Sequence, residues 1–260
     1  MTEDATPELE ASPPLELAPL QSPLTAWQQR FRAILEVILC SSLPTQFLIA
    51  GVLGALGIAP RSGEQLSLTF VFVLSITDSI VLVVLMVVLE RAHGESAWLL
   101  WRGRRPLIRE IALGLLLVPV AVLIVGVIIG SIRTFVPGLH NVPDNPLESL
   151  ATGGPAGAAL FGIVAIVAGG LREELQRAFL LERFERHLGG ETLGVVVLNV
   201  AFGLGHALQG WDAAIATGTL GAFWALVYLR RRSSIAPIIS HAGFNSIEVL
   251  RVAVGGLSVR

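Results

Sequence analysis

The sequence predicts an all-α membrane protein, a polytopic bundle of about seven transmembrane helices. Of its 260 residues, 53% are hydrophobic and only 15% are charged, and the mean hydropathy is +0.72. A soluble domain carries roughly 25% charged residues. The apolar residues form several long runs. Because a helical span needs about 20 such residues, the chain holds one compact bundle.

Residues 1–26 differ in composition from the rest of the chain. They are rich in proline and in acidic residues, and no basic segment precedes an apolar core. They therefore do not read as a signal peptide. With so little apolar surface to bury, this segment is predicted to be a disordered tail.

The apolar segments that follow justify the bundle in chain order. The predicted spans are 34–58, 68–89, 111–132, 155–170, 192–208, 213–229 and 234–254. Pro44 predicts a kink in the first span. Asp78 lies within the second span, either as a functional group or as a structural partner of another helix.

Arginine-rich segments between the spans predict the orientation, because short loops rich in arginine stay in the cytoplasm. All four arginine-rich segments can lie on the cytoplasmic side only if the spans between them cross the membrane and return. Seven spans with a cytoplasmic N-terminus meet this condition. We therefore expect a multi-pass protein of a bacterial inner membrane. The segments are Arg30–Arg32, Arg91–Arg109, Arg172–Arg186 and Arg230–Arg232.

A charged segment interrupts the apolar pattern at Gly169–Arg177, directly after the fourth predicted span. Glu173 and Glu174 precede Arg177 by one helical turn, so both carboxylates can share its guanidinium. Burial opposes ionisation of a carboxylate and a nearby arginine favours it. This competition can poise a glutamate as a general base. The alternative interpretation is a solvated salt-bridge face.

Two later apolar segments each carry a histidine. His206 follows Phe202 by one turn, and His241 precedes Asn245 by one turn. The imidazoles can transfer a proton, and Asn245 can donate to a developing oxyanion. With the glutamates, these groups suit peptide hydrolysis by an activated water. The alternatives are a core histidine at position 206 and interhelical hydrogen bonds from His241 and Asn245.

The order of these motifs resembles a known family. A glutamate pair with a nearby arginine, then F-x-x-x-H, then H-x-x-x-N, resembles the CAAX prenyl protease 2 and bacteriocin-processing (Abi) family of glutamic-type intramembrane proteases. The resemblance covers residues 156–254. It implies a catalytic transmembrane core over 151–260, and motif-free transmembrane helices over 27–150. The catalytic residues that it implies are Glu173, Glu174, Arg177, His206, His241 and Asn245.

The first motif departs from the family pattern, which is E-E-x-x-x-R. Here the arginine comes one residue early, so two alignments are open. Either Glu173 and Glu174 are the family pair and Arg177 has shifted, or Arg177 keeps its place and Arg172 replaces the first glutamate. We favour the first alignment, because Glu173 and Arg177 still share a helix face.

The family resemblance implies an endopeptidase that acts on membrane-associated peptides, prenylated or leader peptides among them, within the bilayer and without a nucleic-acid partner. Two histidines and a glutamate could hold zinc with an open position for water. The chain lacks an H-E-x-x-H helix, and Arg177 opposes a dication, so we predict a metal-independent enzyme without a cofactor. A catalytically silent scaffold or bacteriocin-immunity protein with the same fold is the alternative. A transporter that uses Asp78 and Glu173 as proton carriers is disfavoured, since no two related halves are visible.

Overall fold

A computed structural model describes residues 24–63, 65–143 and 145–258 of the chain. The predicted tail, residues 1–26, lies outside the described residues except for positions 24–26. There Thr25 caps the first helix through a hydrogen bond from the backbone N–H of Gln28. The helices are α1 (Ala26–Leu39), α2 (Leu43–Ala55), α3 (Leu68–Ala92), α4 (Ala97–Arg102), α5 (Leu107–Phe135), α6 (Glu148–Thr152), α7 (Pro155–Val164), α8 (Glu173–His187), α9 (Glu191–Gly205), α10 (Trp211–Arg231) and α11 (Ile235–Ser258).

Short elements complete the described chain. The strands β1 (Arg61–Ser62) and β2 (Gln65–Leu66) form an antiparallel hairpin between α2 and α3. A π-helical segment, Ala165–Arg172, joins α7 to α8 without a break. Two 3₁₀ turns, Pro137–Leu139 and Ala207–Gln209, lie in the connections after α5 and α9.

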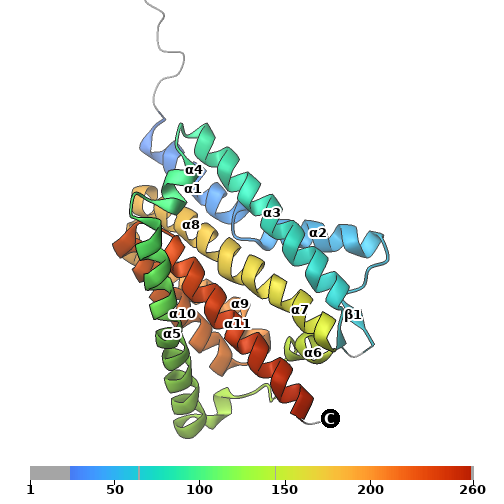
Figure 1. Ribbon diagram of the computed structural model, residues 1–260. Coiled ribbons are helices and arrows are strands. Elements are labelled where there is room, and N and C mark those ends of the chain that lie inside the picture. Colours follow the sequence, from blue (N-terminus) through green and yellow to red (C-terminus); the bar gives the residue numbers. More distant parts are fainter. Residues whose placement is uncertain (1–23, 64, 144, 259–260) are drawn as a thin grey trace, which may run out of the picture.

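The joined helix α7–α8 forms the axis of the bundle (Figure 1). It runs diagonally through the molecule, with α3 along one side and α11 along the other. Helix α5 packs against both α10 and α11. The axis therefore contacts helices from both ends of the sequence, and its side chains lie where the N-terminal and C-terminal halves of the chain meet.

The all-α polytopic bundle predicted from the sequence is confirmed. Among the described residues, five helical segments are long and apolar enough to cross a membrane, and α9 is a shorter apolar helix. The number of spans predicted, about seven, remains a prediction. The five segments are 26–55, 68–92, 107–135, 155–187 and 211–231.

The first predicted span differs from the structure in one respect. It consists of two helices, and the chain turns between them at Ser42, whose φ of 72° lies in the left-handed region. The predicted kink at Pro44 is therefore wrong. Pro44 does not bend a continuous helix, because it lies in the first turn of α2. A proline there removes no intrahelical hydrogen bond.

Helix α8 is buried on nearly all sides although its sequence is strongly polar. Its apolar residues Leu175, Phe179 and Leu181 pack into the main core with Leu82 of α3 and Trp101 of α4. The Trp101 indole N–H also donates to the Leu175 carbonyl oxygen, with an N···O distance of 3.0 Å. These contacts fix the start of α8, where the two adjacent glutamates lie.

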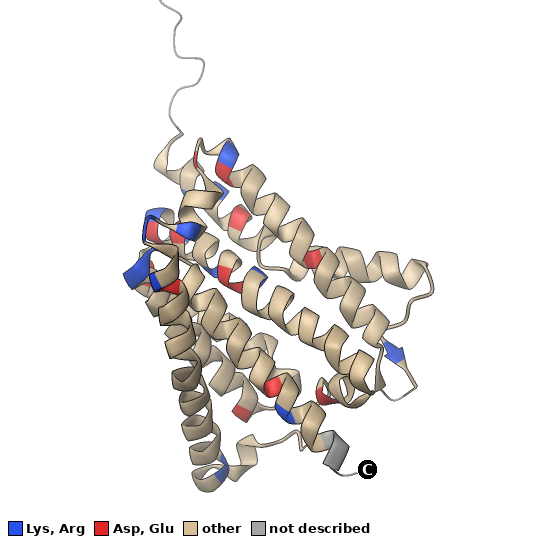
Figure 2. Ribbon diagram, viewed as in Figure 1, with Lys and Arg blue, Asp and Glu red and all other residues tan. Residues whose placement is uncertain are grey.

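The arginine-rich segments gather at one end of the bundle (Figure 2). Arg186 of α8 pairs with Glu95, which precedes α4, and Arg232 pairs with Glu185 of α8. The Arg105 Nε atom donates to the Arg231 carbonyl oxygen at 2.9 Å. The structure thus brings the predicted cytoplasmic loops together at one end.

Three arginines depart from that pattern. Arg172, Arg177 and Arg183 were grouped with the basic loops, but all three are buried inside the bundle. They lie there because acidic side chains compensate their charge: Asp78 and Glu173 face Arg172, and Glu174 pairs with Arg177.

Candidate active site

The π-helical segment positions the site. A π-turn is wider than an α-turn, so it turns the residues that follow and leaves backbone carbonyls available to other partners. Here the Asn245 Nδ2 atom of α11 donates to the Ala165 carbonyl oxygen at 2.9 Å. A Cβ atom at Gly170 would lie 2.6 Å from that of Ala242. The small residues therefore let α11 approach the axis closely, immediately before Glu173.

Glu174 is fully committed to partners. Its side chain is buried, and its Oε1 atom accepts hydrogen bonds from Arg177 and from the His241 Nδ1 atom, the latter at 2.8 Å. Arg177 also places its guanidinium over the Phe202 ring, 4.9 Å from the ring centroid. The expectation that Arg177 serves both glutamates is wrong: its second contact, on α9, draws it to the Glu174 side.

His241 is held on two sides. Its ring stacks on the buried Trp224 ring at a centroid distance of 3.8 Å and an angle of 16°. Because its Nδ1–H donates to Glu174, the Nε2 atom is the nitrogen left for chemistry. That atom lies 4.0 Å from the Glu173 Oε2 atom. Glu174 therefore fixes the orientation of an imidazole that faces Glu173.

Glu173 is less constrained than its neighbour. Its side chain is 16% exposed, and its nearest charged groups are the Arg172 Nη2 atom at 3.8 Å and His241 at 4.0 Å. Both distances exceed that of a hydrogen bond. The Glu173 carboxylate consequently retains lone pairs that can accept a proton.

His206 presents a second imidazole. It is half-buried at the end of α9, and its Nδ1–H donates to the Phe202 carbonyl oxygen at 2.8 Å. A carbonyl oxygen accepts only, so in the neutral imidazole this bond leaves the Nε2 atom without a proton. His206 is thereby a proton acceptor directed at the cavity described next.

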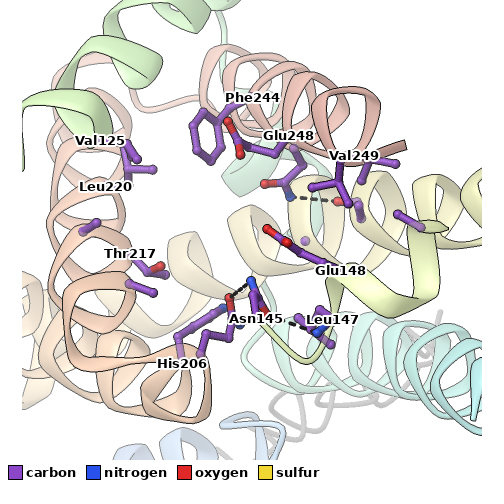
Figure 3. A pocket seen from close by; sticks show the side chains of 18 of the residues that line it. Val125, Asn145, Leu147, Glu148, His206, Thr217, Leu220, Phe244, Glu248 and Val249 are labelled. Carbon is purple, nitrogen blue, oxygen red and sulfur yellow. Dashed lines mark hydrogen bonds between the residues drawn. The ribbon is translucent and has the colours of Figure 1, made fainter. Parts of the chain in front are cut away.

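A cavity of about 470 Å³ joins these groups. Glu173, His206, His241 and Asn245 all line it, while Glu174 and Arg177 lie behind its wall. Figure 3 shows the cavity with Val125, Thr217 and Leu220 along one side and Glu148 and Glu248 projecting from the other. Asn145 lies beside His206 in the same view. The site is a polar cluster inside a largely apolar chamber.

The model of the family described as Rce1-like, type II CAAX prenyl endopeptidase, matches residues 155–247. This segment is therefore similar to the CAAX protease family. Comparisons with curated proteins and with solved structures give no significant match.

The Rce1-like segment contains all six candidate residues, from Glu173 to Asn245. It spans α7, the π-helical segment, α8, α9, α10 and the first half of α11. The chain is therefore a multi-pass membrane protein with a segment similar to CAAX-type endopeptidases. Helices α1 to α6 lie outside the matched residues.

The sequence interpretation missed Asp212 at the rim of the cavity. This buried carboxylate accepts from the Arg133 Nε atom at 3.1 Å and the His140 Nδ1 atom at 2.9 Å. The turn after α5 is thereby tied to the start of α10. An aspartate at the edge of a predicted span was the available signal, since a buried carboxylate needs partners.

A second buried cluster also went unrecognised. Arg183 of α8 donates to Glu36 of α1 at 2.6 Å, to Glu90 of α3 at 2.7 Å and to Glu182 at 3.0 Å. Glu36 and Glu90 lie in apolar helices, and this should have suggested a buried cation. The cluster joins the Rce1-like segment to the helices before it.

Metal-binding geometry occurs away from the cavity. Among the described residues, Glu90, Glu95 and Glu182 form the one set of three whose donor atoms lie within 4.8 Å of one another. Arg183 and Arg186 already pair with these carboxylates and supply the compensating charge. The donors in the cavity, on Glu173, His206 and His241, are not such a set.

Proposed function

We propose that this protein is a metal-independent membrane endopeptidase that cleaves prenylated peptides, with Glu173 as the general base. The observation that supports this most is the contrast between the two glutamates. Glu174 accepts hydrogen bonds from Arg177 and His241. Glu173 instead lines the cavity, and its shortest ion contact, with Arg172, is 3.8 Å long, beyond hydrogen-bond distance. Only a carboxylate with an accessible lone pair can take a proton from water.

The reaction begins with a water between Glu173 and the scissile carbonyl group. Its oxygen attacks the carbonyl carbon while one proton passes to the Glu173 carboxylate. The resulting oxyanion needs donors, and the second N–H of Asn245 is available because the first is engaged by Ala165. Collapse of the intermediate breaks the C–N bond. Glu173 then returns the proton to the leaving amine.

The histidines assist at two places around this water. His241 is oriented by Glu174 in the way a carboxylate orients a catalytic imidazole, with its Nε2 atom toward Glu173. His206 offers an unprotonated Nε2 atom from another side of the cavity. We assign His206 to orienting the water, and His241 to stabilising charge next to Glu173.

The substrate class follows from the family and from the chamber. A CAAX tail carries its prenyl group on a cysteine near the C-terminus. The apolar wall formed by Val125, Leu220 and Phe244 suits such a hydrocarbon chain, and the polar cluster lies beside it. Hydrolysis would release the residues that follow the modified cysteine.

The test uses purified protein in liposomes and a farnesylated peptide with three residues after the modified cysteine. We expect release of the terminal tripeptide, detected by mass spectrometry, and much slower cleavage of the same peptide without farnesyl. The Glu173→Gln protein, prepared in parallel, shows whether a contaminating protease is responsible. A strong chelator should leave the rate unchanged. Restoration of a chelated enzyme by zinc would contradict metal independence.

The shorter spacing before Arg177 favours one second candidate, a catalytically silent scaffold. In the structure Arg177 still pairs with a glutamate despite this spacing, which supports the enzyme. A wild-type protein that is folded but inert toward prenylated and leader peptides would favour the scaffold.

A further inference from the structure

Arg172 has no part in the mechanism above, yet it is the residue next to Glu173. Its side chain is 10% exposed and ends the π-helical segment. The Nη1 atom donates to the Ser42 Oγ atom at 3.1 Å and to the Gln176 Oε1 atom at 2.9 Å. The Nη2 atom faces two carboxylates instead, 3.8 Å from Glu173 and 4.0 Å from Asp78.

Two of the partners that hold Arg172, Ser42 and Asp78, come from outside the Rce1-like segment. Asp78 is fully buried on α3, where Thr45 and Gln46 of α2 donate to its two oxygens. Gln176 donates in turn to the Cys40 carbonyl oxygen at 2.5 Å and to Ser42. The turn between α1 and α2, together with α3, therefore determines where the guanidinium lies.

The distance between Arg172 and Glu173 suits a supporting charge. Arginine stays protonated even when buried, and an opposite charge within about 4–6 Å favours an ionised carboxylate. At 3.8 Å the two groups attract each other without a hydrogen bond that would occupy the carboxylate oxygen. This attraction holds the Glu173 carboxylate in place while its lone pairs stay free. Arg177, by contrast, hydrogen-bonds Glu174 directly and so occupies the Oε1 atom of that residue.

Few other charges act on Glu173 at this range. Among the described residues, Arg172 and His241 are the cationic side chains within 4.0 Å of it. His241 already donates to Glu174, and His206 faces the same cavity from α9. Asp78 competes with Glu173 for the same Nη2 atom.

We propose that Arg172 is a positioning residue for Glu173, and that Asp78 limits this interaction by sharing the guanidinium. Helices α2 and α3, which lie outside the matched segment, thus help to position the proposed base through Arg172. This inference rests on the proposed role of Glu173.

The first test separates positioning from binding. Arg172→Gln should lower kcat for the farnesylated peptide by about 10²-fold, the order expected when a catalytic group is misplaced, and change KM little. Arg172→Lys keeps a cation and should recover part of kcat. Arg32→Gln removes an arginine charge from α1, where Arg32 pairs with Glu36 and not with Glu173, and serves as the matched control. Equal losses in the Gln and Lys variants at unchanged stability would overturn the proposal.

The second test needs no substrate. A hydrophobic carbodiimide modifies protonated carboxyl groups, and mass spectrometry measures the modified fraction of Glu173 at neutral pH. We expect Arg172→Gln to raise this fraction, because Glu173 loses its neighbouring positive charge. Asp78→Asn should lower it, because Arg172 then has Glu173 as its one remaining carboxylate partner. If Arg172→Gln does not accumulate as folded protein, Asp78→Asn decides the matter. Equal or greater labelling in that variant contradicts the proposal.

The two tests distinguish this inference from the proposed function. If labelling rises in Arg172→Gln and falls in Asp78→Asn but the wild-type protein does not cleave the peptide, the inference about Arg172 holds and the proposed protease function fails. If Arg172→Gln has normal turnover and unchanged labelling, the protease function holds and the inference about Arg172 fails.

Discussion

Partners decide which polar side chains in this bundle are free for chemistry. Glu173 and Glu174 are adjacent in sequence, but only Glu174 accepts hydrogen bonds from Arg177 and His241. The carboxylate with more hydrogen-bond partners, Glu174, therefore has the structural role. In a site with low dielectric constant this difference is large, because a paired charge is costly to release.

Glu174→Gln should destabilise the protein. It leaves the buried Arg177 without its carboxylate, and removing one partner of a buried ion pair costs about 3–5 kcal/mol. Thermal unfolding in detergent measures this loss. Glu173→Gln, which breaks no hydrogen bond, is the comparison and should unfold near the wild-type temperature. A larger loss for Glu173→Gln would reverse the two assignments.

Asn245→Ala should reduce turnover per folded molecule by about 10²–10³, the loss expected for one oxyanion donor. The neighbouring Ser246 donates to its own helix at the Ala242 carbonyl oxygen, so Ser246→Ala is the matched control and should keep its turnover. If Asn245 only joins α11 to Ala165, its loss should cost about 0.5–2 kcal/mol of stability. Turnover would then be unchanged, which would end the catalytic interpretation.

At this scale the sequence identified the candidate residues but not their pairing. The spacing of Glu173, Glu174 and Arg177 allowed either glutamate to share the arginine. The choice depends on Phe202, which lies on another helix and attracts the guanidinium. No local pattern contains that information.

The π-helical segment is the element that organises the site. It aims Glu173 at the cavity, exposes a carbonyl oxygen to Asn245 and brings Gly170 against α11. The sequence predicted the apolar spans near their observed positions because long apolar runs are a strong signal. It did not predict the π-turns, which have no comparable signature, nor the break at Ser42.

Gly170→Ala should destabilise the contact between α11 and the axis. The added Cβ atom would lie 2.6 Å from that of Ala242, and overpacking of this kind costs about 1–3 kcal/mol. Gly126→Ala of α5, where a Cβ atom meets nothing within 4 Å, is the control. Adding Ala242→Gly to Gly170→Ala should restore part of the stability. Equal unfolding temperatures for the two single variants would disprove the close approach.

On the scale of the whole molecule, the charges divide into an arginine-rich end and a buried interior. Ion pairs join α1, α3, α8 and the loop after α10 at that end. The composition and the loop arginines predicted a bundle with one basic side, and the structure agrees. The buried cluster around Arg183 was not predicted, since its members lie far apart in sequence.

The basic end should face the cytoplasm, as the arginine distribution predicts. Single cysteines at the exposed positions Arg104 and Asn141, at opposite ends of α5, report the two sides. A membrane-impermeant thiol reagent added outside should label Asn141→Cys and not Arg104→Cys. The native Cys40 is buried and gives a low background. Labelling of Arg104→Cys from outside would reverse the orientation.

The most direct test of the central claim is the turnover of the farnesylated peptide by the Glu173→Gln protein, normalised to folded protein. An amide has the size of the carboxylate but cannot accept the proton, and loss of a general base costs about 10²–10⁴ in rate. We expect a loss of that size with an unchanged unfolding temperature. A Glu173→Gln protein that cleaves the peptide at the wild-type rate would contradict the assignment of Glu173 as the base.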